Sequence, residues 1–496
     1  MRKGLIVLLA VVMVGVFALP AMAEVSFFGT ARVIPTYYNN FDFDKNKPDA
    51  PALNEGGWAS GEHIRGEFRL GWQAGGDKWS VMMLAESDMI FNKNNGDRSY
   101  YSTEGINPTG NTPGQVGGAN SIPNAGAEFG IERALFTYEF FPALQLVAGL
   151  PITSVDIGTG GLLYGDDHPM IGFRGKITGN IKYELIYLNI QNTPAIGLAE
   201  SPLSRDWRAY YLKPDFSIGA GAVKGTLSPI VLFSDYRGNG FPVAAATART
   251  FYYGLEGIGQ FGIIKPSFEV IFADGDLRSG PGTPARDIKS RAAFAGVELA
   301  VNKAFNPYVA GRYTEGDGDK NDNRVEGFVG VTDIGRFTPL MGMDGNILGE
   351  HLSSGASPYN SPLYSYSPDR AVGGNVYGGI GGASSGNNPG QRLLAIGVKG
   401  TLDDYIKNFS YKTQAFMIWY DKTANLSKGA GKPAGKVDKY AGTTFDLQLI
   451  YAFSKNFSAN YIFSMFAPGS GIKDQLASTA DSTFASLHTL NLTWTY

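Results

Sequence analysis

Residues whose types and spacing could support catalysis are few in this chain of 496 residues. The absence of cysteine excludes a disulfide scaffold, a cysteine-ligated metal centre and covalent haem attachment. The four histidines, His63, His168, His351 and His488, do not pair at the spacing of metal ligands. No G-x-S-x-G nucleophile motif stands between a strand and a helix, and no glycine-rich stretch precedes a helix that would cradle a phosphate. We therefore expect no enzyme activity and no cofactor.

An acidic run at residues 312–328 has oxygen ligands dense enough to suggest calcium. Asp317, Asp319 and Asn321 match positions 1, 3 and 5 of an EF-hand loop, but position 6 is not glycine and position 12 is not glutamate. The EF-hand interpretation therefore fails. A solvated loop is the main interpretation, and a loop calcium site on these three residues is the weaker hypothesis.

Charged residues inside otherwise alternating segments are better candidates for function. A charge in mid-strand would be costly in an apolar core but costs little beside water. We expect these side chains to line a water-filled interior: Arg65, Glu67, Arg69, Arg174, Lys176, Lys182, Glu256, Glu269, Glu298, Arg312, Lys399, Lys412 and Asp446. In a closed ring the acidic residues at 256, 269 and 298 would lie on one wall, and many of the basic residues would lie on the opposite wall. The electric field between the two walls would then orient polar solutes. Arg208 and Arg312 do not fit this division, and wetted residues without selectivity are the alternative.

The elements that position these residues have a period of two. In the segment 62–73, Phe68 and Leu70 share one face, whereas Glu67 and Arg69 share the other. The segments that begin near 443, 457 and 489 alternate in the same way. Aromatic residues near the segment ends and full charges on the polar face favour a membrane barrel over a soluble sandwich.

The connections alternate between short and long. Short turns are expected near 75–78, 141–143, 179–180, 216–219, 259–262, 302–305, 403–409 and 454–456. Long loops are expected near 41–61, 91–126, 153–169, 192–204, 236–248, 275–289, 315–391, 422–439 and 468–483. These connections predict an all-β fold, a transmembrane antiparallel β-barrel of about 18 strands (roughly 16–20), with short periplasmic turns and long extracellular loops. The longest loop, 315–391, would either fold into the barrel mouth or stay mobile outside.

The first residues read as a targeting segment. Arg2 and Lys3 precede an apolar run from Leu5 to Leu19, and residues 21–23 form an A-x-A cleavage signal. We expect a signal peptide at 1–23 and a single barrel domain at 24–496, with no plug domain before the first strand. After residue 23 no stretch reaches the roughly 18 apolar residues of a transmembrane helix.

The signal peptide, the alternating strands and the terminal Leu490-Asn491-Leu492-Thr493-Trp494-Thr495-Tyr496 together resemble bacterial outer-membrane porins. The resemblance implies that Leu490, Leu492, Trp494 and Tyr496 form a membrane-insertion signal that the barrel-assembly machinery reads. The strand count and the acidic run at 312–328 before a long loop are similar to the alginate-export and specific-channel group. A strongly basic pore is expected in that group, whereas the interior here is mixed in charge.

Three functions follow as expectations. The first is an outer-membrane, water-filled channel for passive diffusion of small hydrophilic or charged solutes. The second is a polysaccharide export channel or a barrel sheath for a periplasmic multihaem cytochrome, and the third is a secreted soluble β-rich enzyme or binding protein. The partners expected of a barrel are outer-membrane lipid and lipopolysaccharide, the barrel-assembly machinery and small polar solutes, as a homotrimer or a monomer. The net charge of −3 argues against nucleic acid.

Overall fold

The structure is a computed structural model. It describes residues 24–40, 43, 62–90, 93–94, 98–99, 127–156, 158–166, 168–192, 205–219, 221, 223–238, 246–278, 284–319, 321–331, 389–476, 478–479 and 482–496. The predicted signal peptide at 1–23 and most of the loop 315–391 lie outside the described residues.

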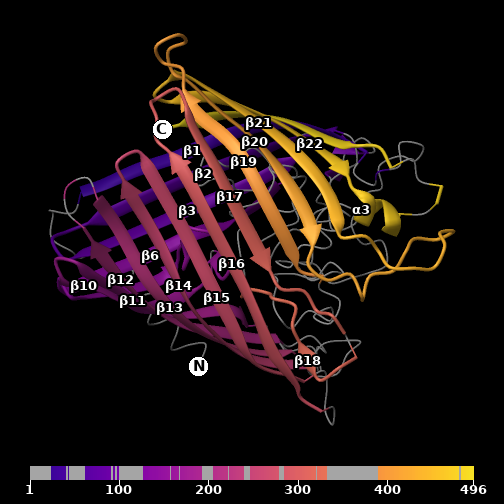
Figure 1. Ribbon diagram of the computed structural model, residues 1–496. Coiled ribbons are helices and arrows are strands. Elements are labelled where there is room, and N and C mark those ends of the chain that lie inside the picture. The colour runs from indigo at the N-terminus through magenta and orange to yellow at the C-terminus, as the bar shows by residue number, and fades with distance from the viewer. Residues whose placement is uncertain are drawn as a thin grey trace.

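Within the described residues, eighteen long strands form one closed antiparallel barrel (Figure 1). They are β1 (Glu24–Asn39), β2 (Glu62–Gly75), β3 (Trp79–Ile90), β6 (Ala127–Phe141), β7 (Leu144–Leu150), β10 (Met170–Thr178), β11 (Ile181–Asn192), β12 (Arg205–Ile218), β13 (Val223–Gly238), β14 (Ala246–Phe261), β15 (Ile264–Arg278), β16 (Arg286–Leu299), β17 (Asn306–Thr314), β19 (Gln391–Thr401), β20 (Phe409–Tyr420), β21 (Tyr440–Ser454), β22 (Phe457–Pro468) and β23 (Ala485–Thr495). Shorter elements are β4 (Lys93–Asn94), β5 (Arg98–Ser99), β8 (Thr153–Ser154), β9 (Gly165–Asp166), β18 (Arg324–Val325) and helix α3 (Ser470–Gln475).

The first and last long strands close the ring. β1 pairs with β23 in antiparallel register, with Ala31 opposite Trp494, and Gly29 and Tyr496 exchange two backbone hydrogen bonds of 3.1 Å. Every other long strand pairs with its neighbours in chain order, allowing for the short strands between them. Closure matters because each strand then has a hydrogen-bonded neighbour on both sides, which is what a sheet in lipid requires.

Short and long connections separate at the two ends of the barrel. The expected short turns join β2 to β3, β6 to β7, β10 to β11, β12 to β13, β14 to β15, β16 to β17, β19 to β20 and β21 to β22. The remaining connections lie at the expected places, but the strands extend into two of the expected long loops, so that the connections at 239–245 and 279–285 are no longer than the short one at 402–408. The prediction of an all-β barrel with about 18 strands is therefore confirmed. Among the described residues, no helix is long and apolar enough to span a membrane.

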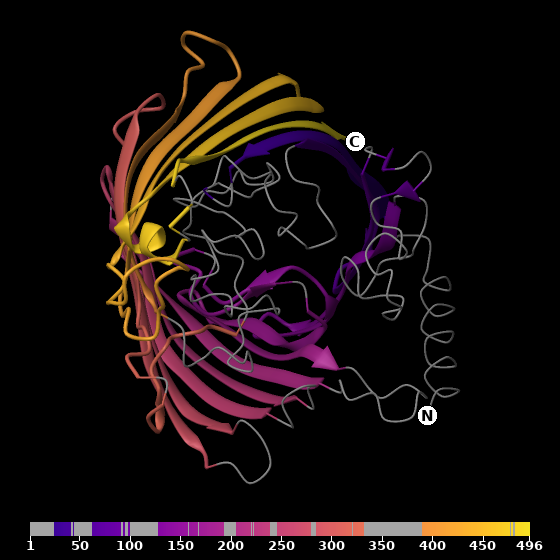
Figure 2. The same cartoon turned by 90° about the vertical axis from the view of Figure 1, so that its right-hand side faces the viewer.

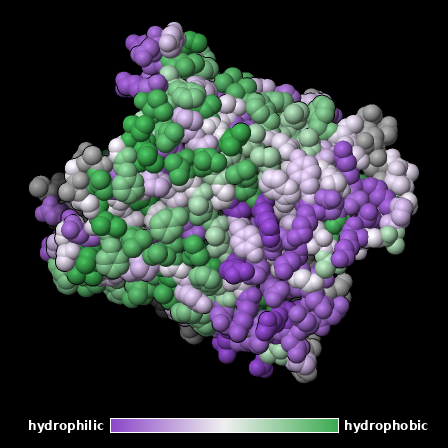
Figure 3. Space-filling model, in the orientation of Figure 1, coloured by the Kyte–Doolittle hydropathy of each residue, from purple (hydrophilic) through white to green (hydrophobic). Residues whose placement is uncertain are grey.

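The strands present an apolar face outward. On β15, Phe268 and Phe272 are 37% and 39% exposed on the outside, whereas Glu269 and Ile271 between them are fully buried on the inside. Outward aromatic rings also stack across strands, with 4.6 Å between the ring centres of Phe457 and Trp494. Figure 3 shows the resulting apolar band over this face of the barrel. An apolar outer surface that encircles a closed sheet is suited to lipid rather than water.

Two connecting segments fold inside the ring. The first, residues 151–166, contains β8 and β9, and the second is residues 325–331. Figure 2 looks along the barrel, and the violet segment with β8 and β9 lies within the ring of strands. Both segments belong to the buried apolar cluster, through Leu162, Leu163, Phe328 and Val331 among others. The interior is therefore partly a packed core.

Candidate functional site

The interior wall formed by β11 to β16 is mainly apolar. Its apolar inward side chains that are at most 2% exposed include Leu188, Ala209, Tyr211, Ile230, Leu232, Tyr252, Ile271, Ile288 and Ala292, and the equally buried polar ones are Ser228, Thr250 and Glu269. The folded-in segments cover them: the Val331 amide donates to the Leu163 carbonyl at 2.8 Å, and the Tyr252 hydroxyl donates to the Val329 carbonyl at 2.9 Å. This half of the interior is occupied by protein, because apolar side chains facing an open lumen would lose the free energy of burial.

The segment 151–166 is held in shape by its own hydrogen bonds. The Val155 amide and the Ser154 hydroxyl donate to the Tyr164 carbonyl at 3.0 and 2.9 Å. The fully buried carboxylate of Asp156 accepts from the backbone amides of Leu163 and Tyr164 at 2.6 and 3.3 Å. These bonds replace the hydration that the carboxylate loses on burial, so the hairpin can sit inside the barrel.

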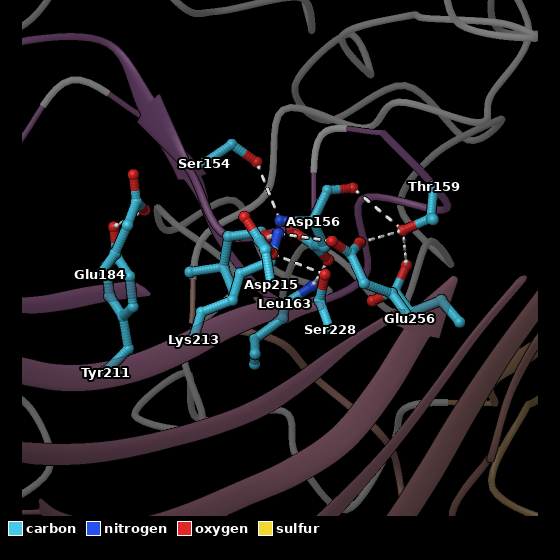
Figure 4. A network of polar contacts seen from close by, with 12 residues as sticks. Ser154, Asp156, Thr159, Leu163, Glu184, Tyr211, Lys213, Asp215, Ser228 and Glu256 are labelled. Carbon is cyan, nitrogen blue, oxygen red and sulfur yellow. Dashed lines mark hydrogen bonds and ion pairs between the residues drawn. The ribbon is translucent and has the colours of Figure 1, made fainter. Parts of the chain in front are cut away.

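A polar clamp fixes this hairpin to the wall (Figure 4). The Thr159 hydroxyl lies 2.8 Å from Glu256 Oε2 and 2.9 Å from Glu269 Oε2, and the Gly160 amide donates to Glu269 Oε2 at 2.9 Å. Lys213 forms an ion pair with Glu256 and donates to the Val155 carbonyl. The predicted interior residues Glu256 and Glu269 thus face inward, but their described contacts are with protein groups.

Gly160 allows the hairpin to approach the wall. A Cβ atom at this position would lie 2.6 Å from Phe294 Cβ and 3.0 Å from Glu269 Oε2. Because Cβ atoms do not tolerate 2.6 Å, any other residue here would push the hairpin away from β15 and β16. The clamp therefore depends on the absence of a side chain at Gly160 as well as on the charged residues of the wall.

The wall formed by β1, β2, β3 and β6 is charged. Arg69 forms ion pairs with Glu67 at 2.9 Å and Glu132 at 3.3 Å, and also with Glu86. Glu67 in turn pairs with Arg32 of β1. The side chains of Arg69, Glu86 and Glu132 face the interior and are still 16–17% exposed. Solvent therefore reaches them inside the ring.

A second group of polar side chains lies on the wall from β15 to β22. Glu298 pairs with Lys399 at 2.7 Å and with Lys265 at 3.3 Å. The buried Asp446 accepts from Gln414 Nε2 at 2.7 Å and from the Ser464 hydroxyl at 2.6 Å. Lys412 faces inward on β20, opposite Lys399 in the strand register. Acidic, basic and amide groups therefore alternate along this wall.

The remaining predicted residues occupy varied positions. Arg174 donates to Gln145 Oε1 at 2.6 Å, while Lys176 and Lys182 are exposed and oppose one another beside the turn between β10 and β11. Arg312 is buried on the inner face of β17. Arg65 lies on β2, but its side chain is outside the described residues.

The described ion pairs do not divide the interior into an acidic and a basic wall. Glu256 pairs with Lys213, Glu298 with Lys399, and Arg69 with acids on its own and neighbouring strands. The expected separation fails because strand register places opposite charges beside one another, and register depends on turn geometry. Arg208, which did not fit the expected division, is exposed next to the inward, buried Ala209.

Several interior charged and polar residues are not among those expected from the sequence. Arg32, Glu86 and Lys213 stand at inward positions of alternating strands, so the same period could have identified them. Asp156 and Thr159 carry no such signal, because their contacts arise only when a loop folds inside the ring.

The calcium hypothesis for Asp317, Asp319 and Asn321 gains no support from the geometry. Asp317 Oδ1 accepts from the Asp319 amide and Asp319 Oδ1 from the Asn321 amide, both at 3.0 Å. Burial also raises the pKa of Asp317. Within the described part of the chain, no three acidic, histidine or cysteine side chains form a group that could hold a metal ion.

The predicted insertion signal lies on β23 and just after it. Trp494 and Tyr496 are 41% and 51% exposed, and Leu490 and Leu492 alternate with the buried Asn491. Their outward position agrees with contact to lipid. A role in recognition by the assembly machinery remains a prediction.

No protein-family model and no curated protein sequence matches the chain. Among solved structures, OccAB2 of Acinetobacter baumannii is similar over 95% of this chain and 98% of its own, with 12% identity and a TM-score of 0.52. OccAB3 of the same organism is similar over 95% of this chain and 99% of its own, with 10% identity and a TM-score of 0.51. At such identities the likeness concerns the fold, and the chain has the barrel fold of these outer-membrane porins.

Proposed function

We propose that the protein is an outer-membrane channel for passive diffusion of small hydrophilic or charged solutes. The observation that carries this proposal is the unequal interior: the β11–β16 half is covered by packed segments, whereas charged side chains elsewhere remain accessible to solvent. Arg69, Glu86 and Glu132 are the clearest of these. A polar path beside an apolar, occupied half would conduct water-soluble molecules and reject apolar ones.

The outer membrane is the location that best fits the outer face of the barrel. An apolar band surrounds a closed antiparallel sheet, and short turns and long loops lie at opposite ends, as in bacterial barrels. In that membrane the short turns would face the periplasm. The membrane lipid, including lipopolysaccharide, would then cover the outward aromatic residues.

The charged residues divide into two roles under this proposal. Arg69, Arg174, Lys399 and Lys412 would line the solute path, together with Lys176, Lys182 and Glu298, whereas the buried Glu67 and Asp446 would hold the wall behind it. Glu256 and Glu269 instead position the hairpin that narrows it, because they contact Thr159 and Gly160. Selectivity would come from closely spaced opposite charges, which favour solutes that carry both donors and acceptors over ions of one sign.

The internal segments favour a channel for small solutes over the other expectations. A sheath for a folded cytochrome needs a wide lumen, whereas residues 151–166 and 325–331 pack inside this one. A secreted soluble protein would leave Phe268, Phe272 and the other outward rings in water, which is unfavourable. The packed segments and the outward rings together favour a membrane channel for small solutes.

Planar-bilayer recording of the purified, full-length protein tests the proposal. We expect discrete conductance steps, and swelling of protein-containing liposomes in small sugars or amino acids but not in large polysaccharides. Heat-modifiable gel mobility establishes that the barrel is folded. A folded protein that gives neither conductance nor solute flux would disprove the channel.

A further inference from the structure

Six lysines gather where β20, β21 and β22 reach the long-loop end. They lie in residues 421–439 and 469–479, which we call the lysine-rich rim: Lys422, Lys428, Lys432, Lys436, Lys439 and Lys473. Its acidic residues are Asp421, Asp438 and Asp474. The apolar residues of the rim join the interior cluster, but its lysines take no part in the ion pairs of the interior, so their charge calls for a separate explanation.

The two parts of the rim form one built surface. The Gly429 amide donates to the Asp474 carbonyl, and the Ser478 amide donates to the Ala430 carbonyl, both at 2.9 Å. The Asp438 amide donates to Asp474 Oδ2 at 2.9 Å. Beneath them, Val437 and Ile472 are 2% exposed and belong to the apolar cluster. The lysines therefore project from a fixed support.

The positive charge of the rim is only partly neutralised by its own acids. Lys428 pairs with Asp474 at 3.2 Å, while the buried Asp421 is engaged by Arg392 of β19 at 2.6 Å. Lys432 and Lys439 donate to backbone carbonyls, which do not cancel their charge. Lys436 and Lys473 are exposed. The rim therefore presents an excess of ammonium groups.

The rim lies at the level where an outer leaflet would place its headgroups. Trp419 of β20 and Tyr440 of β21 are neighbours, with 5.9 Å between ring centres, immediately before and after the loop that carries five of the lysines. Trp and Tyr at strand ends mark the boundary between lipid and water. On the outer face, hydrophilic atoms adjoin the apolar band at the long-loop end (Figure 3). In Figure 2, helix α3 stands over the wall of the ring.

We propose that the lysine-rich rim binds the phosphate groups of lipopolysaccharide in the outer leaflet. Ammonium groups projecting from a fixed support just above an aromatic boundary meet anionic headgroups without leaving the membrane surface. Each basic side chain near an anionic lipid surface adds to the attraction, and the effect declines within a Debye length. The proposal rests on the outer-membrane location in the proposed function, but it does not require that the barrel conduct solutes.

Native mass spectrometry of the full-length protein in detergent, titrated with purified lipid A, tests the proposal. The test variant changes Lys422, Lys432, Lys436 and Lys473 to Gln. The matched control changes four exposed lysines beside the short turns, Lys224, Lys303, Lys407 and Lys455, to Gln. We expect the test variant to bind lipid A at least tenfold more weakly, and the control to bind like the unchanged protein. Both variants are checked for heat-modifiable mobility.

Two further measurements test whether the rim binds the phosphate groups of the lipid. Dephosphorylated lipid A should bind at least tenfold more weakly than lipid A to the unchanged protein, and added salt should weaken lipid A binding. Equal binding of the two lipids, or equal loss in test and control variants, would overturn the proposal. So would displacement of lipid A by millimolar inorganic phosphate, which would assign the rim to a free anion. Conductance of the test variant should stay unchanged, so failure here is distinct from failure of the channel.

Discussion

The hydroxyl of Thr159 lies 2.8 Å from Glu256 Oε2, and this contact joins a loop segment to the inner wall of the barrel. The same hydroxyl lies 2.9 Å from Glu269 Oε2. One small side chain therefore serves two buried carboxylates on neighbouring strands. The side chains that hold the internal hairpin in position can therefore be tested by single substitutions.

Replacing Thr159 with Val should loosen the hairpin without disturbing the barrel. The substitution keeps the shape of the side chain but leaves Glu256 and Glu269 with one donor fewer, at a cost of about 1–3 kcal/mol. We expect noisier and larger single-channel currents in planar bilayers. Thr413→Val, on the lipid-facing side of β20, is the control and should conduct normally. Identical traces from both variants would show that the clamp does not limit the current.

Replacing Gly160 with Ala tests the close approach of the hairpin. The new Cβ would meet Phe294 Cβ at 2.6 Å, so we expect displacement of the hairpin and a loss of about 1–3 kcal/mol from over-packing. Gly179→Ala, at a turn where a Cβ meets nothing within 4 Å, is the matched control. Thermal unfolding and limited proteolysis of folded protein measure the effect. Equal stability in the two variants would contradict the packing.

Neutralising Arg69 should make the channel prefer cations. Arg69→Gln leaves Glu67, Glu86 and Glu132 without their shared partner, so the accessible wall gains net negative charge. We expect a shift of the reversal potential toward cation selectivity in a salt gradient, and a stability loss of about 1–3 kcal/mol. Arg208→Gln, a substitution of an exposed residue next to an inward one, serves as the control. An unchanged reversal potential in Arg69→Gln would show that this wall does not line the solute path.

The rim should come apart only in strong acid. The hydrogen bond from the Asp438 amide, with help from Lys428, holds the pKa of Asp474 below its ordinary value of 3.8. A lowered carboxyl pKa contributes stability above the unfolded value and loses it as the pH falls through the folded one. We expect the Asp438 amide to stay protected from hydrogen exchange at pH 5 and to lose protection only when the pH falls below the ordinary carboxyl value of 3.8. In Asp474→Asn this pH dependence should disappear.

Strand positions and inward faces were readable from the sequence because lipid and water impose a period of two. That period places Glu256 and Arg69 on the inner face. Their partners were not readable, for two different physical reasons. Arg69 meets Glu86 through the strand register, while a bulge in β6 between Ile131 and Arg133 adds Glu132 to the interior. Glu256 meets Thr159 only because a loop packs inside the ring, which follows from side-chain shape rather than from any period.

The internal hairpin also gives the barrel two mechanically different sides. From β11 to β16 the wall is backed by a layer of closely packed side chains, so bending it would open gaps in that layer. From β1 to β6 the described wall instead carries ion pairs between side chains, which can exchange with water as strands move. Thermal fluctuation should therefore widen the ring mainly on its polar side, and the largest solute admitted would be set by how far that side yields.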